Sequence, residues 1–305
     1  MKLRYSPLPW ILCPILLLQG CTQKNKAELV VKERRNIVVP SDGPSLPAPR
    51  TVAIGRDGAI LVLDTAGRFL VYEPGGELRH EWRMPDSKVG KPEGVCELND
   101  GRYVVADTHY HRLVFFDRTG QAVAFLGSLG KEPGQFIYPI KVTTDPAGNL
   151  YVAEYGGNDR VQKFSADLKF LVAMGKNGTE NEGLQRASGV VWHDHKIFVS
   201  DAVNNAVKVF SDDGKFLKVL STPELGLKLP YDLASGSTNS LYIIEYGAGR
   251  VTRVSFDGTL QGRYGTPGTG PGHFRTPWGI GVNPKGEVFV ADTGNRQVIK
   301  LVFTK

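Results

Sequence analysis

The sequence predicts an all-β fold, a six-bladed β-propeller, from three observations. One pattern occurs six times: an apolar strand, a tight turn, a second strand that ends in an acidic residue, a polar loop and a third strand. The acidic residues follow one another at intervals of 43 to 47 residues. The strands are short, rich in β-branched and aromatic residues, and show no helical periodicity, which is typical of four-stranded propeller blades. The acidic residues are Asp64, Asp107, Glu154, Asp201, Glu245 and Asp292.

The turns between these strands support the same fold. Asp57-Gly58 and Asp100-Gly101 stand between the first and second strands of their repeats, and Asp257-Gly258 stands between a third and a fourth strand. Asp-Gly pairs supply the positive φ that two-residue hairpins need. Glycine-rich links, such as residues 127–136 and 265–274, join one repeat to the next. The positions of the turns and links therefore indicate six consecutive antiparallel sheets.

The last repeat has the most distinctive sequence. Residues 274–282 read Phe-Arg-Thr-Pro-Trp-Gly-Ile-Gly-Val, and residues 286–300 continue with Val-Phe-Val-Ala-Asp-Thr-Gly-Asn-Arg at their centre. This segment resembles an NHL repeat, and the likeness extends over residues 49–303. The resemblance implies a six-bladed NHL-type propeller over residues 49–305.

The sixth repeat ends after its third strand, so its outer strand must come from elsewhere. An open sheet edge invites pairing with other chains, which favours closure of the ring. We expect residues 28–48 to supply the closing strand, within residues 28–39, and a proline-rich link to the first blade. The alternative for this segment is a disordered tether.

The N-terminal segment has the order of an export signal. Lys2 and Arg4 precede an apolar run over residues 10–18, which is too short for the roughly 20 residues that cross a bilayer. Residues 18–21, Leu-Gln-Gly-Cys, resemble a lipobox. This predicts a bacterial lipoprotein signal peptide over residues 1–20, lipidation of Cys21 and a lipid-anchored tether over residues 21–27. An ordinary cleaved signal is the alternative.

The predicted location and charge restrict the partners. We expect the domain outside the cytoplasm, lipid-anchored in the outer membrane or on the outer face of the cytoplasmic membrane. Without Lys2 and Arg4 the 37 basic residues become 35 against 31 acidic ones, a net charge of +4, of which +3 lies in residues 22–50. The propeller is thus nearly neutral, whereas nucleic-acid binding needs a strong basic excess. We expect a monomer that binds no nucleic acid.

The acidic residue that ends each second strand is followed, in five repeats, by an arginine four to six residues later. We expect the two to hold the intervening loop together by charge-assisted hydrogen bonds. The fourth repeat has Ala206 at the arginine position, which predicts a loop held in another way.

The loops after the second strands and the links between repeats should share one face of the ring, here called the loop face. The first strands should enter the ring there at Arg50, Glu93, Lys141, Ser188, Tyr231 with Asp232, and Trp278. Two loops carry Glu-Tyr-Gly, whose tyrosines are either packing variants or an aromatic recognition surface. The candidate ligand-binding residues at the loop face and channel mouth are Glu93, Lys141, Tyr155, Tyr231, Asp232, Tyr246 and Trp278.

Metal-dependent chemistry is the alternative use of this face. His109 and His111 share one loop and His273 lies on another, so a zinc site is conceivable from spacing, but surface histidines are the favoured interpretation. The repeats are similar to those of the peptidyl-hydroxyglycine amidating lyase, whose resemblance implies metal-binding histidines at the inner-strand entrances. None of the entrances here is histidine. Calcium held by Glu93 and Asp232 is a further possibility.

The sequence therefore predicts, first, a binding module for a protein, a peptide or an envelope glycan, with no cofactor. The alternative is a metal-dependent extracytoplasmic lyase or hydrolase related to the propeller amidating or streptogramin lyases. One propeller scaffold serves many functions, so the fold does not decide between them.

Overall fold

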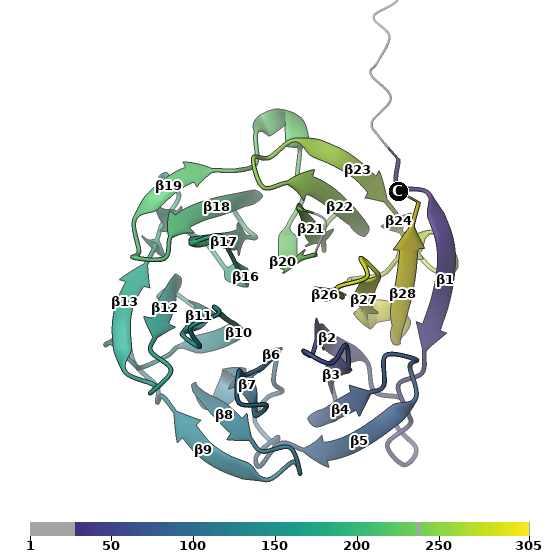
Figure 1. The fold of residues 1–305 in the computed structure, drawn as a ribbon, viewed down its shortest axis with the longest axis horizontal. Coiled ribbons are helices and arrows are strands. Elements are labelled where there is room, and N and C mark those ends of the chain that lie inside the picture. Colours follow the sequence, from purple (N-terminus) through teal and green to yellow (C-terminus); the bar gives the residue numbers. More distant parts are fainter. Residues whose placement is uncertain (1–27, 237–238, 305) are drawn as a thin grey trace, which may run out of the picture.

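The computed structural model describes residues 28–236 and 239–304 and has six four-stranded antiparallel sheets arranged as blades around a central axis (Figure 1). The predicted six-bladed propeller is confirmed. The predicted signal peptide, the tether and Cys21 lie outside the described residues. The described part contains no helix of the length and hydropathy that crossing a membrane requires.

Each blade runs from an inner strand beside the axis to an outer strand at the rim. In the first three blades the strands, from inside to outside, are β2 (Pro49–Ile54), β3 (Ile60–Asp64), β4 (Arg68–Tyr72) and β5 (Leu78–Arg83); β6 (Gly94–Glu97), β7 (Tyr103–Asp107), β8 (Arg112–Phe116) and β9 (Ala122–Leu126); and β10 (Tyr138–Thr144), β11 (Leu150–Tyr155), β12 (Arg160–Phe164) and β13 (Phe170–Met174).

In blades four to six the strands, in the same order, are β16 (Ala187–His193), β17 (Lys196–Asp201), β18 (Ala206–Ser211) and β19 (Phe216–Val219); β20 (Pro230–Ser235), β21 (Ser240–Glu245), β22 (Arg250–Ser255) and β23 (Leu260–Tyr264); and β26 (Gly279–Val282), β27 (Val288–Asp292), β28 (Gln297–Phe303) and β1 (Val31–Ile37).

Short elements complete the links and loops. Two-residue parallel ribbons form in two inter-blade links, and three 3-10 helices stand in links or second-strand loops. They are β14 (Lys176–Asn177) with β15 (Gly183–Leu184), β24 (Thr266–Pro267) with β25 (His273–Phe274), η1 (Thr108–Tyr110), η2 (Pro223–Leu225) and η3 (Thr293–Asn295).

The hydrophobic core lies between the faces of adjacent blades. All five residues of β3 and of β7 are buried, because both faces of each sheet pack against a neighbour. Phe69 of blade one packs edge-on against Tyr103 of blade two, with ring centroids 5.2 Å apart. Burying such a side chain stabilises the fold by roughly 1.5–3 kcal/mol. Packing between blades therefore fixes the order in which the strand ends surround the axis.

The ring is closed by the N-terminal strand, as predicted. β1 pairs antiparallel with β28, with Arg34 opposite Leu301 and Ile37 opposite Val298. The same blade thus contains the first and the last strands of the described chain. No blade is left with three strands.

The link from β1 to blade one is held by a buried cation. Arg68, only 1% exposed, donates from Nη2 to the carbonyl of Pro40 (2.6 Å) and from Nη1 to the carbonyl of Ser41 (3.3 Å). Its Nε donates to the Asp64 carboxylate at 2.8 Å. The Tyr72 hydroxyl donates to the carbonyl of Val38 (2.9 Å). The side chains of blade one therefore hold the segment that follows β1, in addition to the pairing of β1 with β28.

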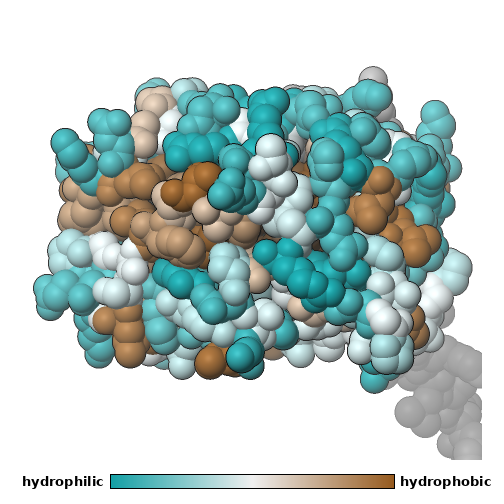
Figure 2. Space-filling view, turned by 90° about the horizontal axis from the view of Figure 1, so that it is seen from below, coloured by the Kyte–Doolittle hydropathy of each residue, from teal (hydrophilic) through white to brown (hydrophobic). Residues whose placement is uncertain are grey.

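The rim of the disc is partly apolar. Figure 2 shows apolar side chains gathered in a band on the edge of the molecule. Val123 and Phe125 of β9 and Leu171 of β13 are about half exposed on outer strands. This surface is separate from the loop face, where the site below lies.

Candidate functional site

The inner strands deliver their side chains to the axis through β-bulges. The register shifts at the start of β2, β10, β16 and β20, so that one extra residue is inserted in each strand. In β2 and β20 the extra residues are Arg50 and Tyr231. A bulge redirects the side chain it carries. The side chains of consecutive residues such as Tyr231 and Asp232 can therefore both point toward the axis, with Tyr231 at the mouth and Asp232 deeper in the channel.

Stacked side chains from blades one, five and six form one side of the channel mouth. Trp278 stacks on Tyr231, with centroids 5.7 Å apart and planes at 21°. Tyr246 also packs against Tyr231, with centroids 5.8 Å apart and planes at 35°. The guanidinium of Arg50 lies over Trp278 at 4.5 Å and pairs with the carboxylate of Glu93. Three of the predicted ligand-binding aromatics are thus brought together.

A second arginine continues this arrangement toward blade three. Arg186, on the link into blade four, lies over the rings of Tyr155 (4.7 Å) and Tyr231 (5.2 Å), and its Nη2 donates to the Tyr231 hydroxyl at 2.7 Å. Tyr155 in turn packs against Tyr138, with centroids 5.3 Å apart. Such cation–π contacts attract each guanidinium to the face of a ring. The sequence prediction missed Arg186 and Tyr138, which lie outside the repeated entrance positions.

We define the mouth ring as these stacked and paired groups. Its members are Arg50, Glu93, Tyr138, Tyr155, Arg186, Tyr231, Tyr246 and Trp278.

The mouth ring holds polar atoms without partners. Among the described residues, Arg50 Nε, Arg186 Nε and Glu93 Oε2 are buried and make no hydrogen bond. A buried polar atom left unpaired costs about 1–3 kcal/mol, which a suitable ligand group would recover. Burial, reinforced by the charge of Glu93, raises the pKa of Tyr231, so its hydroxyl stays protonated. The ring therefore offers donors and an acceptor beside flat apolar surfaces.

A largely apolar cavity opens beside the stacked rings. It has a volume of about 230 Å³ and is lined by Val203 and Leu229 together with Tyr231, Tyr246 and Trp278 of the mouth ring. Concave apolar surfaces with a few convergent polar groups are typical of ligand sites. Tyr246 thus lines a cavity as well as packing on its neighbour.

Lys141 and Asp232 lie inside the channel and bind each other. Lys141 Nζ is 2.6 Å from Asp232 Oδ2, and the two residues are 7% and 2% exposed. Asp232 also accepts hydrogen bonds from the backbone N–H groups of Leu233 (2.8 Å) and Ile280 (3.1 Å). Burial raises the pKa of Asp232, against the effect of Lys141. The pair ties blade three to blade five, and a cavity of about 230 Å³ opens between the inner strands beside Lys141.

The two carboxylates considered for calcium are both engaged. Glu93 pairs with Arg50 and Asp232 pairs with Lys141.

The expected loop pairs form in four blades. The acidic residue and the following arginine are 2.6 to 2.9 Å apart in Asp64–Arg68, Asp107–Arg112, Glu154–Arg160 and Glu245–Arg250. In blade four Lys208 replaces the arginine and lies 3.0 Å from Asp201, which confirms that this loop is held differently. The expectation is wrong for Arg296 of blade six. There Asn295 and Gln297 donate to Asp292, because Arg296 adopts a left-handed conformation at the end of η3.

One carboxylate oxygen of Asp107 lacks the hydrogen-bond partner that its counterparts in blades three to six have. In blades three to six the acidic residue also accepts a backbone N–H from the preceding inter-blade link, as Glu154 does from Ile137 at 2.8 Å. Asp107 Oδ1 is buried and has no partner among the described residues. Burial raises the pKa of Asp107 from 3.8 to about 6, and Arg112 opposes the shift.

This difference gives a pH-dependent stability. The folded state holds the Asp107 proton up to about pH 6, whereas the unfolded chain releases it near pH 3.8. The free energy of unfolding should therefore fall as the pH rises through this interval. Urea unfolding between pH 4 and pH 7 should show this decline in the wild type and a smaller decline in Asp107→Asn, where other buried carboxyls with a raised pKa, such as Asp232, still contribute. Asp257→Asn is the control, since the pKa of exposed Asp257 is lowered to about 2 and it stays ionised throughout. An identical decline in Asp107→Asn would contradict the assignment.

The histidines considered for a metal lie on two different segments. His109 and His111, in the loop of blade two, pack against Tyr138, with centroids 5.6 Å from its ring. His273, on the link before blade six, lies 2.9 Å from the Thr266 hydroxyl. Within residues 28–236 and 239–304, no group of three or more histidine, cysteine or acidic side chains is arranged to hold a metal ion.

Comparison with known proteins defines the class. Residues 274–301 match the NHL repeat model, so the chain is a six-bladed β-propeller that carries an NHL repeat. It is 28% identical to human NHL repeat-containing protein 3 over 167 residues, and this alignment covers 50% of this chain and 48% of that protein. It is also 28% identical over 185 residues to Xenopus laevis peptidyl-glycine alpha-amidating monooxygenase A, covering 56% and 18%. The chain thus spans about half the length of the first relative and less of the second.

Solved structures share the fold at low sequence identity. A gluconolactonase from Xanthomonas campestris has a TM-score of 0.66 at 14% identity, covering 92% of this chain and 99% of that one. Virginiamycin B lyase from Staphylococcus aureus has a TM-score of 0.62 at 14% identity, covering 89% and 99%. A chain of a nidogen/laminin complex has a TM-score of 0.62 at 16% identity, covering 81% and 86%. Enzymes and a protein of a complex thus share this ring.

Proposed function

We propose that this protein is a binding module that holds a peptide or a glycan at the mouth ring. The observation that carries the proposal is the set of unpaired buried atoms on Arg50, Arg186 and Glu93, placed beside the stacked Tyr231 and Trp278. These groups combine flat apolar surfaces with hydrogen-bonding atoms in one concave site. Peptides and sugars present the same combination, apolar faces next to carbonyl, hydroxyl and charged groups.

The rings and the arginines have complementary roles in such binding. Trp278 and Tyr231 supply large rigid contact surfaces, and aromatic and arginine side chains are the usual anchors of binding interfaces. Arg186 offers its free Nε to a carboxylate or carbonyl oxygen, and Glu93 Oε2 accepts from an amine or hydroxyl. Preorganisation by stacking lowers the entropy that binding would otherwise cost.

The proposal includes a location outside the cytoplasm. Cys21, in the lipobox-like segment, would carry the lipid, and residues 21–27 would form the tether. The ligand would then be a component of the cell envelope. The nearly neutral propeller is consistent with a partner other than nucleic acid.

Fluorescence titration tests the site. The soluble chain, residues 22–305, is titrated with soluble envelope glycan fragments and with their attached peptides. We expect a saturable change in tryptophan emission with at least one of them and about 30-fold weaker binding of that ligand to Trp278→Ala, since an aromatic anchor contributes about 2 kcal/mol or more. Phe125→Ala, which removes an exposed rim aromatic, should bind as the wild type does. Equal affinity of Trp278→Ala and wild type, measured by calorimetry, would refute the proposal.

Elemental analysis of the same preparation, without a histidine tag, tests the alternative. About one equivalent of zinc, lost in His109→Ala or His111→Ala, would favour the metal-dependent lyase or hydrolase over the binding module.

A further inference from the structure

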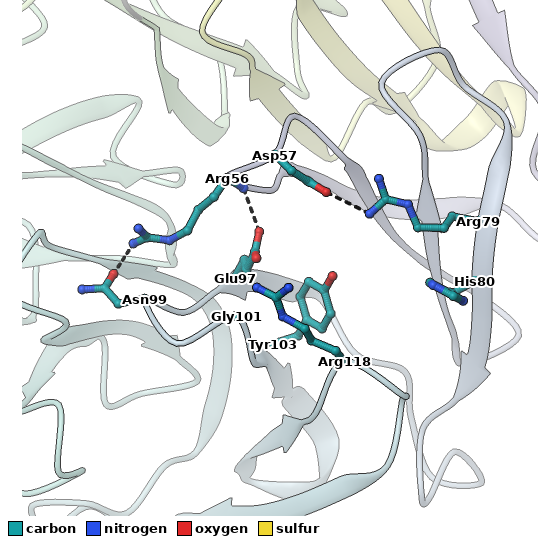
Figure 3. A pocket seen from close by; sticks show the side chains of 9 residues that line it. All are labelled: Arg56, Asp57, Arg79, His80, Glu97, Asn99, Gly101, Tyr103 and Arg118. Atoms are coloured by element: carbon teal, nitrogen blue, oxygen red, sulfur yellow. Dashed lines mark hydrogen bonds and ion pairs between the residues drawn. The ribbon is translucent and has the colours of Figure 1, made fainter.

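A third cavity lies on the face opposite the mouth ring, at the junction of blades one and two. It has a volume of about 280 Å³ (Figure 3). Blade one contributes Arg56 and Asp57, from the turn between β2 and β3, and Arg79 of β5. Blade two contributes Glu97 at the end of β6, Tyr103 of β7 and Arg118 from the turn between β8 and β9. The cavity is therefore an inter-blade pocket, independent of the proposed function.

The carboxylates of this pocket already have donors. Asp57 Oδ2 is 2.9 Å from Arg79 Nη1, and Arg79 binds Glu73 as well. Glu97 Oε2 accepts the backbone N–H of Arg56 at 2.7 Å. Figure 3 shows the Asp57 and Glu97 carboxylates directed to these donors.

Two guanidinium groups remain without a carboxylate. The Arg56 side chain donates only to the amide oxygen of Asn99, a neutral acceptor. The Arg118 side chain makes no hydrogen bond or ion pair within the part of the chain that the structure describes. Its guanidinium lies over Gly101, where a Cβ would come 2.1 Å from Nη2. Gly101 has φ +83°, so the turn itself favours glycine, and the missing Cβ leaves room for the Arg118 guanidinium.

A neutral donor lies in the same pocket. Tyr103 is largely buried, and burial together with the charges of Glu97 and Asp57 raises the pKa of its hydroxyl. The hydroxyl therefore remains protonated and can donate. The pocket thus combines two arginines that lack an acidic partner with a phenol donor. Arginine binds phosphate oxygens through two parallel N–H groups.

We infer that this inter-blade pocket binds a phosphate group, with Arg118 and Arg56 as its principal donors. The group is either free phosphate or the phosphate of a lipid headgroup, which present the same oxygens. Three arginines against two carboxylates leave the lining with a net charge of +1, which favours an anion. The exposed position makes the affinity dependent on salt.

Calorimetric titration of the full chain with inorganic phosphate at low ionic strength tests this inference. We expect saturable binding that weakens about tenfold or more in Arg118→Ala, because hydrogen bonds to a charged group are among the strong ones. Arg118→Lys should bind with intermediate affinity, since it keeps the positive charge but loses the two parallel N–H donors of the guanidinium. Glu97→Gln should bind more tightly, because it removes a negative charge from the lining. Lys215→Ala, which removes an exposed cation from a turn of blade four, should leave the affinity unchanged.

A vesicle arm separates the two sources of phosphate. Cosedimentation with phosphatidylglycerol vesicles but not with phosphatidylcholine vesicles, lost in Arg118→Ala, would identify a lipid headgroup. Phosphate binding without vesicle binding would identify a soluble phosphate. Absence of saturable phosphate binding, or equal affinities of Arg118→Ala and wild type, would overturn the inference. Neither result bears on the mouth ring, where Trp278→Ala is the diagnostic variant.

Discussion

Replacing Arg68 with alanine should lower the free energy of unfolding by about 3–5 kcal/mol, because the variant leaves a buried carboxylate without its cation. Arg68 and Asp64 are 1% and 0% exposed and pair at 2.8 Å. The variant also removes the donors to the carbonyls of Pro40 and Ser41. It therefore weakens blade one and the segment that closes the ring at the same time.

Urea unfolding followed by circular dichroism at pH 7 measures this loss. Arg102→Ala is the matched control, since Arg102 pairs with Asp100 on the surface and such pairs contribute about 1 kcal/mol or less. Protease digestion should cut Arg68→Ala between β1 and β2 before it cuts elsewhere. A loss no larger than that of Arg102→Ala would show that the pair does not hold the closure.

Lys141→Met is expected to cause a loss of similar size, about 3–5 kcal/mol at neutral pH, by leaving Asp232 buried and unpaired. Methionine has nearly the length of lysine, so the change removes the charge more than the volume. The loss should shrink as the pH falls toward 4. Burial already raises the pKa of Asp232 above 3.8, so the folded variant can take up a proton there more readily than the unfolded chain.

The double variant Lys141→Met/Asp232→Asn distinguishes charge from packing. Its neutral amide can still accept the N–H of Ile280, so most of the lost stability should return. Denaturation of the single and double variants at pH 4 and pH 7 gives the comparison. If the double variant is as unstable as Lys141→Met at pH 7, the lysine stabilises the channel through packing and not through its charge.

The fold was accessible from the sequence because each blade is a local unit. The acidic residue of every second strand, the Asp-Gly turns and the spacing of 43 to 47 residues all arise from contacts within one blade. The closing strand was predictable because the sixth repeat lacks one strand and an unpaired edge is unfavourable. The loop pairs were predictable for the same reason, except that local backbone geometry at Arg296 directs its side chain elsewhere.

The site was only partly accessible, because it is made by contacts between blades. Lys141 and Asp232 are 91 residues apart, and the bulges at Ile140 and Tyr231, one residue before each of them, change which side chains point to the axis. Arg186 stands on a link with φ +66°, outside any strand periodicity. The pocket around Arg118 is formed by turns of two blades. The sequence pattern of a single repeat does not show which turns come together in space.

The pairing of β1 with β28 also sets the order in which the chain can fold. Val31 lies opposite Phe303, so the first strand of the described chain waits for the last before it has a partner. Contacts so distant in sequence are slow to form, and until they do β1 and β28 both present open edges. Five blades can assemble from neighbouring hairpins, but the sixth cannot be completed until β28 has been synthesised. Assembly of the whole ring therefore includes one late step, the pairing of β1 with β28.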